Sequence, residues 1–147
     1  MEAFESASTS ETSKIIEVIP TPLAVKPRNI QLTPDFNLAE FLRPQDPVPA
    51  PYVLDNLYRL ANRLQLLRDL LGRPIRINSG YRTIAHNQEV GGVQNSQHLS
   101  GTAVDIVVPG LMPRDLQLIL MNWSGGMGQY KTYTHLDIRP YRARWRG

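Results

Sequence analysis

The chain has 147 residues, a formal net charge of +3 and 41% hydrophobic residues, as in an ordinary globular domain with room for an extension. It contains no cysteine, which excludes disulfide scaffolds, thiolate metal sites and cysteine nucleophiles. No stretch reaches the ~20 apolar residues of a membrane-spanning helix, so we expect no membrane partner.

The charges are divided unevenly along the chain. Residues 1–51 hold seven acidic and four basic residues, whereas residues 52–147 hold six acidic and twelve basic ones. Two interpretations of this basic part stay open: a solvated face, or a surface for an anionic partner such as a cell-wall polymer or an acidic protein. We expect no nucleic-acid partner, because the sequence has no basic recognition helix and no basic patch with interleaved aromatic residues.

We expect residues 1–30 to form an extended, proline-rich arm. The first fourteen residues are acidic and rich in hydroxyl groups, with neither the basic nor the apolar region of a secretory signal peptide. Eight of the twelve prolines lie between Pro20 and Pro51. An isolated segment of this kind buries too little apolar surface to fold. We therefore expect the arm to be a tether or a contact with a protein partner.

Residues 31–147 are expected to form one domain. A helical turn is predicted at 36–42, and a helix at 52–71, where apolar side chains recur every three or four positions before Gly72 and Pro74. The remaining predicted elements are a strand at 74–78, a helix at 83–90, a strand at 102–108, a helix at 113–123 and a strand at 132–138. Because no regular βαβ repeat is present, the predicted class is α+β, with a small antiparallel sheet and flanking helices.

Asp105 places a carboxylate inside the apolar strand predicted at 102–108. An unpaired buried carboxylate costs several kcal/mol, so Asp105 needs a cation, a set of donors or a raised pKa. An ion pair with a buried arginine would also satisfy it. His98 lies seven residues earlier in a polar loop, and His135 and Asp137 share one face of the strand predicted at 132–138.

Two histidines and one aspartate would make a three-ligand metal set. Three protein ligands with an open fourth position are typical of catalytic zinc, which lowers the pKa of its bound water to about 7. The same donors occur in non-haem iron sites. In iron oxygenases of the double-stranded β-helix type, however, a second histidine follows the His-x-Asp pair. None follows Asp137 here, and the predicted strands are too few for that fold.

The segment from Ser96 to Asp105 reads S-x-H-x-x-G-x-A-x-D. It resembles the zinc signature of the M15 metallopeptidases, the D-alanyl-D-alanine carboxypeptidase group that acts on peptidoglycan. Residues 79–82 (S-G-Y-R) and 133–139 (Y-T-H-L-D-I-R) resemble the flanking motifs of that group. The resemblance covers about residues 31–145. It implies the fold of the hedgehog and DD-peptidase type, in the branch whose peptidase is the C-terminal domain of a longer chain.

By this resemblance, His98, Asp105 and His135 are the ligands of Zn²⁺. Arg82 would bind the substrate carbonyl or carboxylate and stabilise the oxyanion, since a guanidinium offers paired donors. A purely structural arginine that closes the turn at residues 79–80 is the alternative. Ser96 is expected to orient a ligand.

The general base does not follow from the resemblance. Some members of the group carry glutamate where this chain has Thr132, and others carry histidine where it has Tyr133. Asp137 is the candidate proton acceptor. A salt bridge from Asp137 to Arg139 or Arg142 is the equal alternative.

Two functions follow as hypotheses. The first is a zinc-dependent peptidase that hydrolyses amide bonds next to D-amino acids in peptidoglycan stem peptides. With no leader and with an arm, we expect it to be made in the cytoplasm and to act on the cell wall, as a phage lysin or a virion-associated tail hydrolase. The alternative is a catalytically weak or inactive zinc-binding module of a larger assembly, which the missing glutamate or histidine base favours.

Overall fold

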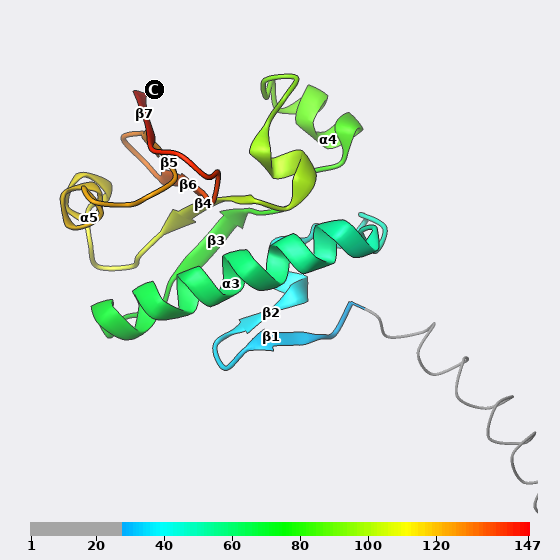
Figure 1. The fold of residues 1–147 in the computed structure, drawn as a ribbon, viewed down its shortest axis with the longest axis horizontal. Helices are drawn as coiled ribbons and strands as arrows, with labels where there is room; N and C mark the ends of the chain where they lie inside the picture. The colour runs from blue at the N-terminus through cyan, green and yellow to red at the C-terminus, as the bar shows by residue number, and fades with distance from the viewer. Residues whose placement is uncertain (1–27) are drawn as a thin grey trace, which may run out of the picture.

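The computed structural model describes residues 28–147, in which helices and strands mix as an α+β fold (Figure 1). The arm predicted at 1–30 lies outside the described residues except for its last three. This part of the chain contains no helix with the length and apolar character needed to cross a bilayer. The α+β class predicted from the sequence is confirmed.

The elements follow the predicted order closely. Their bounds are β1 Gln31–Thr33, β2 Phe36–Asn37, the 3-10 helix η1 Leu38–Phe41, α3 Pro51–Leu71, β3 Arg76–Ser79, α4 Ile84–Glu89, the 3-10 helix η2 Gln97–Ser100, β4 Ala103–Val107, α5 Pro113–Ile119, β5 Gly126–Gln129, β6 Thr134–Asp137 and β7 Ala143–Arg146. The strands make a β1–β2 hairpin and a five-stranded sheet in the order β3-β4-β6-β5-β7.

Helix α3 supplies much of the core. Pro51 at its first turn presets the helical backbone, and Gly72 ends it in the left-handed region at φ 63°, with its N–H bonded to the Arg68 carbonyl at 2.9 Å. Its buried leucines join one hydrophobic cluster with Val104 and Ile106 of β4. The helix runs along one side of the sheet, and α4 lies on the other side (Figure 1).

Successive side chains of a strand point to opposite faces of the sheet, so every second residue of β4 and β6 points away from this core. In β4, Val104 and Ile106 point into the core, so Asp105 between them points to the opposite face. In β6, Leu136 points into the core, and His135 points to the same face as Asp105. The antiparallel register pairs Asp105 directly with His135. Two polar side chains are thereby brought together on the face away from α3.

The sheet differs from the prediction at its last two strands. Residues 126–129 form β5, which is absent from the predicted elements because Gly126 and Gly128 disfavour regular structure. Strand β7 was not predicted, and it pairs with β5 in parallel, so the sheet is mixed rather than wholly antiparallel. The helix predicted at 113–123 ends at Ile119.

Both the backbone conformation and the packing at position 101 require a glycine. It ends η2 at φ 74°, and a Cβ there would lie 2.8 Å from Cγ1 of Val53 in α3. We expect Gly101→Ala to lower the free energy of unfolding by about 3 kcal/mol, through left-handed strain together with overpacking. Denaturant titration measures the effect.

Gly91→Ala is the matched control. Gly91 has a similar φ of 69°, but a Cβ there would meet no atom within 4 Å. Its expected cost is about 1 kcal/mol, from the backbone alone. If Gly101→Ala and Gly91→Ala lowered the free energy of unfolding equally, the close packing of α3 against Gly101 would be contradicted.

Candidate metal centre

A cavity of about 760 Å³ opens on the face of the sheet away from α3. Its walls come from the loops around α4, from η2 and from strands β4, β6 and β7. The lining residues are Asn78, Arg82, Val90, Gly91, Gly92, Val93, Ser96, His98, Asp105, Tyr130, Tyr133, His135, Arg139 and Trp145. The cavity therefore gathers nearly all the residues that the sequence motifs single out.

Three of these side chains converge from separate elements: His98 from η2, Asp105 from β4 and His135 from β6. One ligand atom of each lies within 4.8 Å of the others. All three residues are buried. The structure thus brings together the three residues predicted as metal ligands. Ser96 supports the group from behind, since its hydroxyl accepts the backbone N–H of His98 at 3.2 Å.

The contacts of His98 assign its tautomer. Its Nδ1 lies 2.7 Å from the carbonyl oxygen of Gly80, which can only accept, so Nδ1 carries the proton. Its Nε2 lies 3.2 Å from Oδ1 of Asp105, which is also an acceptor. A neutral imidazole has one N–H, so the lone pair of Nε2 faces the carboxylate.

His135 repeats this arrangement with its nitrogens exchanged. Its Nε2 lies 3.0 Å from Oδ2 of Asp137, and its Nδ1 lies 3.0 Å from Oδ1 of Asp105. Burial lowers the pKa of His135, but the contacts with the two carboxylates raise it by more. With Nε2 donating to Asp137, Nδ1 donates to Oδ1 of Asp105 when the ring is charged and turns a lone pair toward it when the ring is neutral, the form that binds a metal.

Two imidazole nitrogens and one carboxylate oxygen therefore meet at one point. When both rings are neutral all three atoms are acceptors, so the group is held together either by an extra proton on each histidine or by a cation. Burial raises the pKa of Asp105, but the contacts with His135 and His98 lower it by more, so the carboxylate stays charged. Two imidazoles and a carboxylate fit the donor set of zinc, and the carbonyl and carboxylate behind the rings are the partners that metal-bound histidines use.

Arg82 lies beside the ligands and makes three contacts. Its Nη2 donates to Oδ2 of Asp105 at 3.0 Å, its Nε to Ser79 at 3.1 Å and its Nη1 to Asn87 at 3.3 Å. Asp105 was predicted either to bind a metal or to pair with a buried arginine, and the structure combines the two arrangements. Oδ2 binds Arg82, and Oδ1 faces His98 and His135. The guanidinium also closes the turn at Ser79 and borders the cavity.

Asp137 lies behind His135 and does not line the cavity. Besides His135 it accepts two hydrogen bonds from the Arg139 side chain, at 2.8 and 2.7 Å, and one each from the backbone N–H groups of Arg139 and Gly126, at 3.3 and 2.9 Å. Burial raises its pKa, and the contacts with His135, Arg139 and Gly126 lower it by more. The salt bridge to Arg139 is confirmed. Proton transfer by Asp137 stays a prediction.

Sequence reasoning missed the aromatic wall of the cavity. Tyr133 stacks on Tyr130 with ring centroids 4.5 Å apart, and Trp145 donates from Nε1 to the Tyr130 hydroxyl at 3.1 Å. The Trp145 ring lies 5.1 Å from that of His135. Trp145 alternates with arginines in β7, and this short apolar–polar alternation is the signal that could have indicated a strand there. The Gly80 carbonyl and Asn87 were also missed.

The contacts of Asp137 lead to a prediction about metal affinity. We expect Asp137→Asn to weaken zinc binding by about 10–100-fold, because Asp137 holds His135 by its Nε2. Competition with a chromophoric chelator measures the affinity, and thermal unfolding in the presence of chelator reports any loss of fold.

Asp55→Asn, an exposed acid on α3, is the control and should bind zinc normally. A proton acceptor would behave differently from a positioning residue. Unchanged zinc affinity in Asp137→Asn, with a lost acidic limb in its pH–rate profile, would contradict the positioning role.

Comparison with known proteins agrees with this geometry. The family model described as Peptidase M15 matches residues 34–137. A zinc D-Ala-D-Ala carboxypeptidase of Streptomyces albus G is 42% identical over 45 residues, which are 30% of this chain and 18% of that protein. The match therefore spans less than a fifth of the relative's length. The family and the group of His98, Asp105 and His135 support the predicted zinc cofactor. The chain belongs to the Peptidase M15 family.

Proposed function

We propose that this protein is a zinc-dependent peptidase that hydrolyses amide bonds next to D-amino acids in peptidoglycan stem peptides. The observation that carries the proposal is the convergence of His98, Asp105 and His135 with Arg82 at one cavity. The family supports a peptide substrate. The D-Ala-D-Ala specificity in the name of the Streptomyces relative supports the choice of substrate.

Zinc, when bound by His98, Asp105 and His135, would supply a Lewis acid and lower the pKa of a water molecule. The residues of the chain provide the rest. Arg82 presents a cation at the edge of the ligand group, where negative charge develops on the carbonyl oxygen in the transition state. Because Ser79 and Asn87 hold its guanidinium, little reorganisation is needed. The Tyr133 and Trp145 rings give the cavity an apolar wall beside the ligands.

Mass spectrometry of digested wall fragments tests this proposal. The zinc-loaded protein is incubated with purified muropeptides, both cross-linked and free, and the products are sequenced. We expect one new amine and one new carboxylate per turnover, at an amide bond next to a D-residue. The bond that is cut also decides between endopeptidase and carboxypeptidase action. Cleavage only of peptides made from L-residues would overturn the substrate assignment.

A second function is favoured by one observation. Within residues 28–147, the carboxylate that lines the cavity is Asp105, which the metal and Arg82 engage, so the cavity offers no free carboxylate as general base. A zinc-binding wall module with weak catalysis would fit this arrangement. In the same experiment it would bind muropeptides and leave them intact.

The remaining expectations concern delivery. A role as a phage lysin or tail hydrolase, action on the cell wall after synthesis in the cytoplasm, and a protein partner for residues 1–30 stay predictions. They rest on residues that lie mostly outside the described part of the chain.

A further inference from the structure

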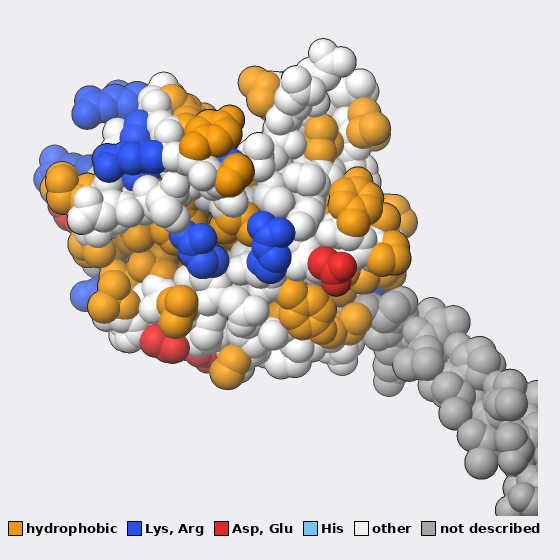
Figure 2. Space-filling model, viewed as in Figure 1, with side chains coloured by type: hydrophobic (Ala, Val, Ile, Leu, Met, Phe, Trp, Pro, Cys, Tyr) orange, Lys and Arg blue, Asp and Glu red, His pale blue; other side chains and the backbone are white. Residues whose placement is uncertain are grey.

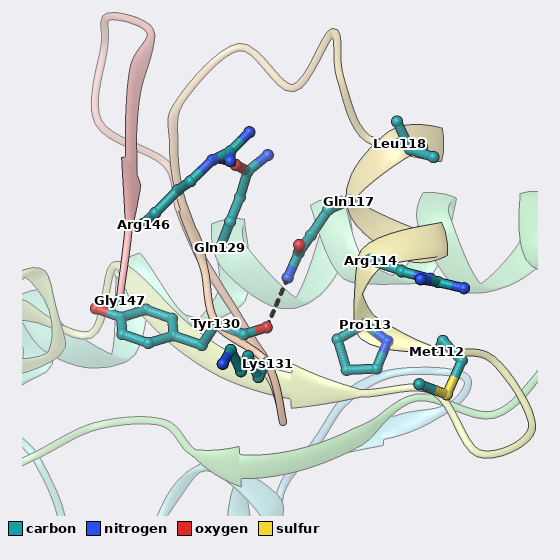
Figure 3. Close-up of a pocket in the computed structure, with 10 residues that line it drawn as sticks. All are labelled: Met112, Pro113, Arg114, Gln117, Leu118, Gln129, Tyr130, Lys131, Arg146 and Gly147. Atoms are coloured by element: carbon teal, nitrogen blue, oxygen red, sulfur yellow. Dashed lines mark hydrogen bonds between the residues drawn. The ribbon is translucent and has the colours of Figure 1, made fainter.

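A second pocket of about 570 Å³ lies between α5 and strands β5 and β7. Figure 3 shows its sides: Arg146 and Gln129 extend from the strands, and Gln117 extends from α5. Met112, Pro113 and Leu118 add apolar surface. We call this space the cationic pocket, after Arg114, Lys131 and Arg146, which also line it.

In the part of the chain that the structure describes, the side chains that line the cationic pocket include three basic residues and no acidic one. Asp115, the acid next to it, lies 4.0 Å from Arg114. Within residues 28–147, Lys131 and Arg146 form no salt bridge, and both are exposed. Arg146 is oriented by Gln129, whose Oε1 accepts its Nε–H at 3.2 Å. Basic side chains gather over this part of the molecule in Figure 2.

The cationic pocket adjoins the cavity of the metal centre. Tyr130 lines both spaces. On the side of the metal cavity, the Tyr130 ring stacks on Tyr133, and its hydroxyl accepts a hydrogen bond from Trp145. On the other side, Nε2 of Gln117 donates to the Tyr130 carbonyl at 3.1 Å, the bond drawn in Figure 3. A chain molecule that leaves the metal cavity past Tyr130 therefore reaches Lys131 and Arg146 next.

We propose that the cationic pocket binds a carboxylate-bearing peptide segment, namely the part of the substrate that continues beyond the bond at the metal centre. This inference rests on the proposed peptidase function. The volume suits a short peptide stretch. The apolar surface suits side-chain methylene groups, and Lys131 and Arg146 suit carboxylates. Nucleic acid fits less well, because Tyr130, the pocket's one aromatic side chain, is already stacked on Tyr133.

Binding of labelled peptides tests the pocket without requiring catalysis. The full chain is titrated, zinc-loaded and after chelation, with a fluorescent Glu-Ala-Glu-Ala peptide and with its Gln-Ala-Gln-Ala counterpart. We expect the acidic peptide to bind about tenfold more tightly at low salt, and the Lys131→Gln/Arg146→Gln double variant to lose this preference. The Arg59→Gln/Arg73→Gln variant, with changes at two exposed arginines that line neither space, should keep it.

Kinetics on stem peptides with free or amidated carboxyl groups form the second arm. The double variant should raise KM for the free acid about tenfold and leave kcat and KM for the amide unchanged. If no stem peptide is cleaved, the proposed function is wrong. The titrations with the two labelled peptides then still test whether the cationic pocket binds carboxylates. Equal affinity of the wild type for both peptides, or a preference that survives in the double variant, would overturn the inference. The inference would also be overturned if the protein bound polyphosphate but not the acidic peptide.

Discussion

His98→Ala is expected to lose both stoichiometric zinc and peptidase activity, with kcat/KM reduced by at least about a thousandfold. His98 is the ligand whose tautomer is set by a backbone carbonyl, that of Gly80. Alanine leaves two ligands, Asp105 and His135, and the Asp105 carboxylate then keeps only Arg82 and His135 as partners. The readouts are metal content by mass spectrometry and the rate of muropeptide cleavage.

His86→Ala is the matched control for this variant. His86, the remaining histidine of the chain, lies on α4 outside the ligand group, and its Nδ1 has no hydrogen-bond partner among residues 28–147. It should keep zinc and activity. Circular dichroism of His98→Ala separates loss of metal from loss of fold. A folded, zinc-free His98→Ala protein with unchanged activity would refute the metal mechanism.

Arg82→Lys is expected to lower kcat by about 10²–10³-fold and to leave zinc bound. Lysine keeps the positive charge, but it cannot hold Ser79, Asn87 and Asp105 at once through a planar fork. The cation beside the reacting carbonyl is then no longer fixed. Steady-state kinetics and metal analysis of the same preparation give the two readouts.

The outcome separates a catalytic role for Arg82 from a structural one. Arg59→Lys, an exposed change on α3, should behave as wild type in both measurements. If Arg82→Lys lost zinc and thermal stability together with activity, the arginine would serve to hold Asp105 and the turn at Ser79, and oxyanion stabilisation would have to come from elsewhere.

The helices could be predicted because their signals are local. The pattern of leucines in α3 ends at Gly72, and Thr83 accepts the His86 N–H at the start of α4, as a capping residue does. Strand β5 carried the opposite local signal. A Cβ at Gly126 would lie 2.3 Å from the Asp137 carboxylate, and one at Gly128 would lie 2.5 Å from the Trp145 ring. These glycines are required by neighbours distant in sequence, which local propensity does not register.

The metal ligands could be located from spacing and motif, because Asp105 and His135 occupy strand positions whose face is set by alternation. The role of Asp137 could not. Sharing a face with His135 is compatible with accepting a proton at the metal site and with holding the His135 ring from behind. Only the tertiary position of Arg139 and Gly126 places Asp137 behind the ring. The aromatic wall depends on β7, whose sequence Ala-Arg-Trp-Arg alternates apolar and basic residues over only four positions and does not indicate which strand it pairs with.

The most direct test of the metal centre is anomalous X-ray diffraction from zinc-loaded crystals, recorded on both sides of the zinc absorption edge. The account predicts one peak per chain, bonded at about 2.0–2.2 Å to Nε2 of His98, a carboxylate oxygen of Asp105 and Nδ1 of His135. A peak at another set of residues, or no peak among these three in zinc-saturated crystals, would contradict it.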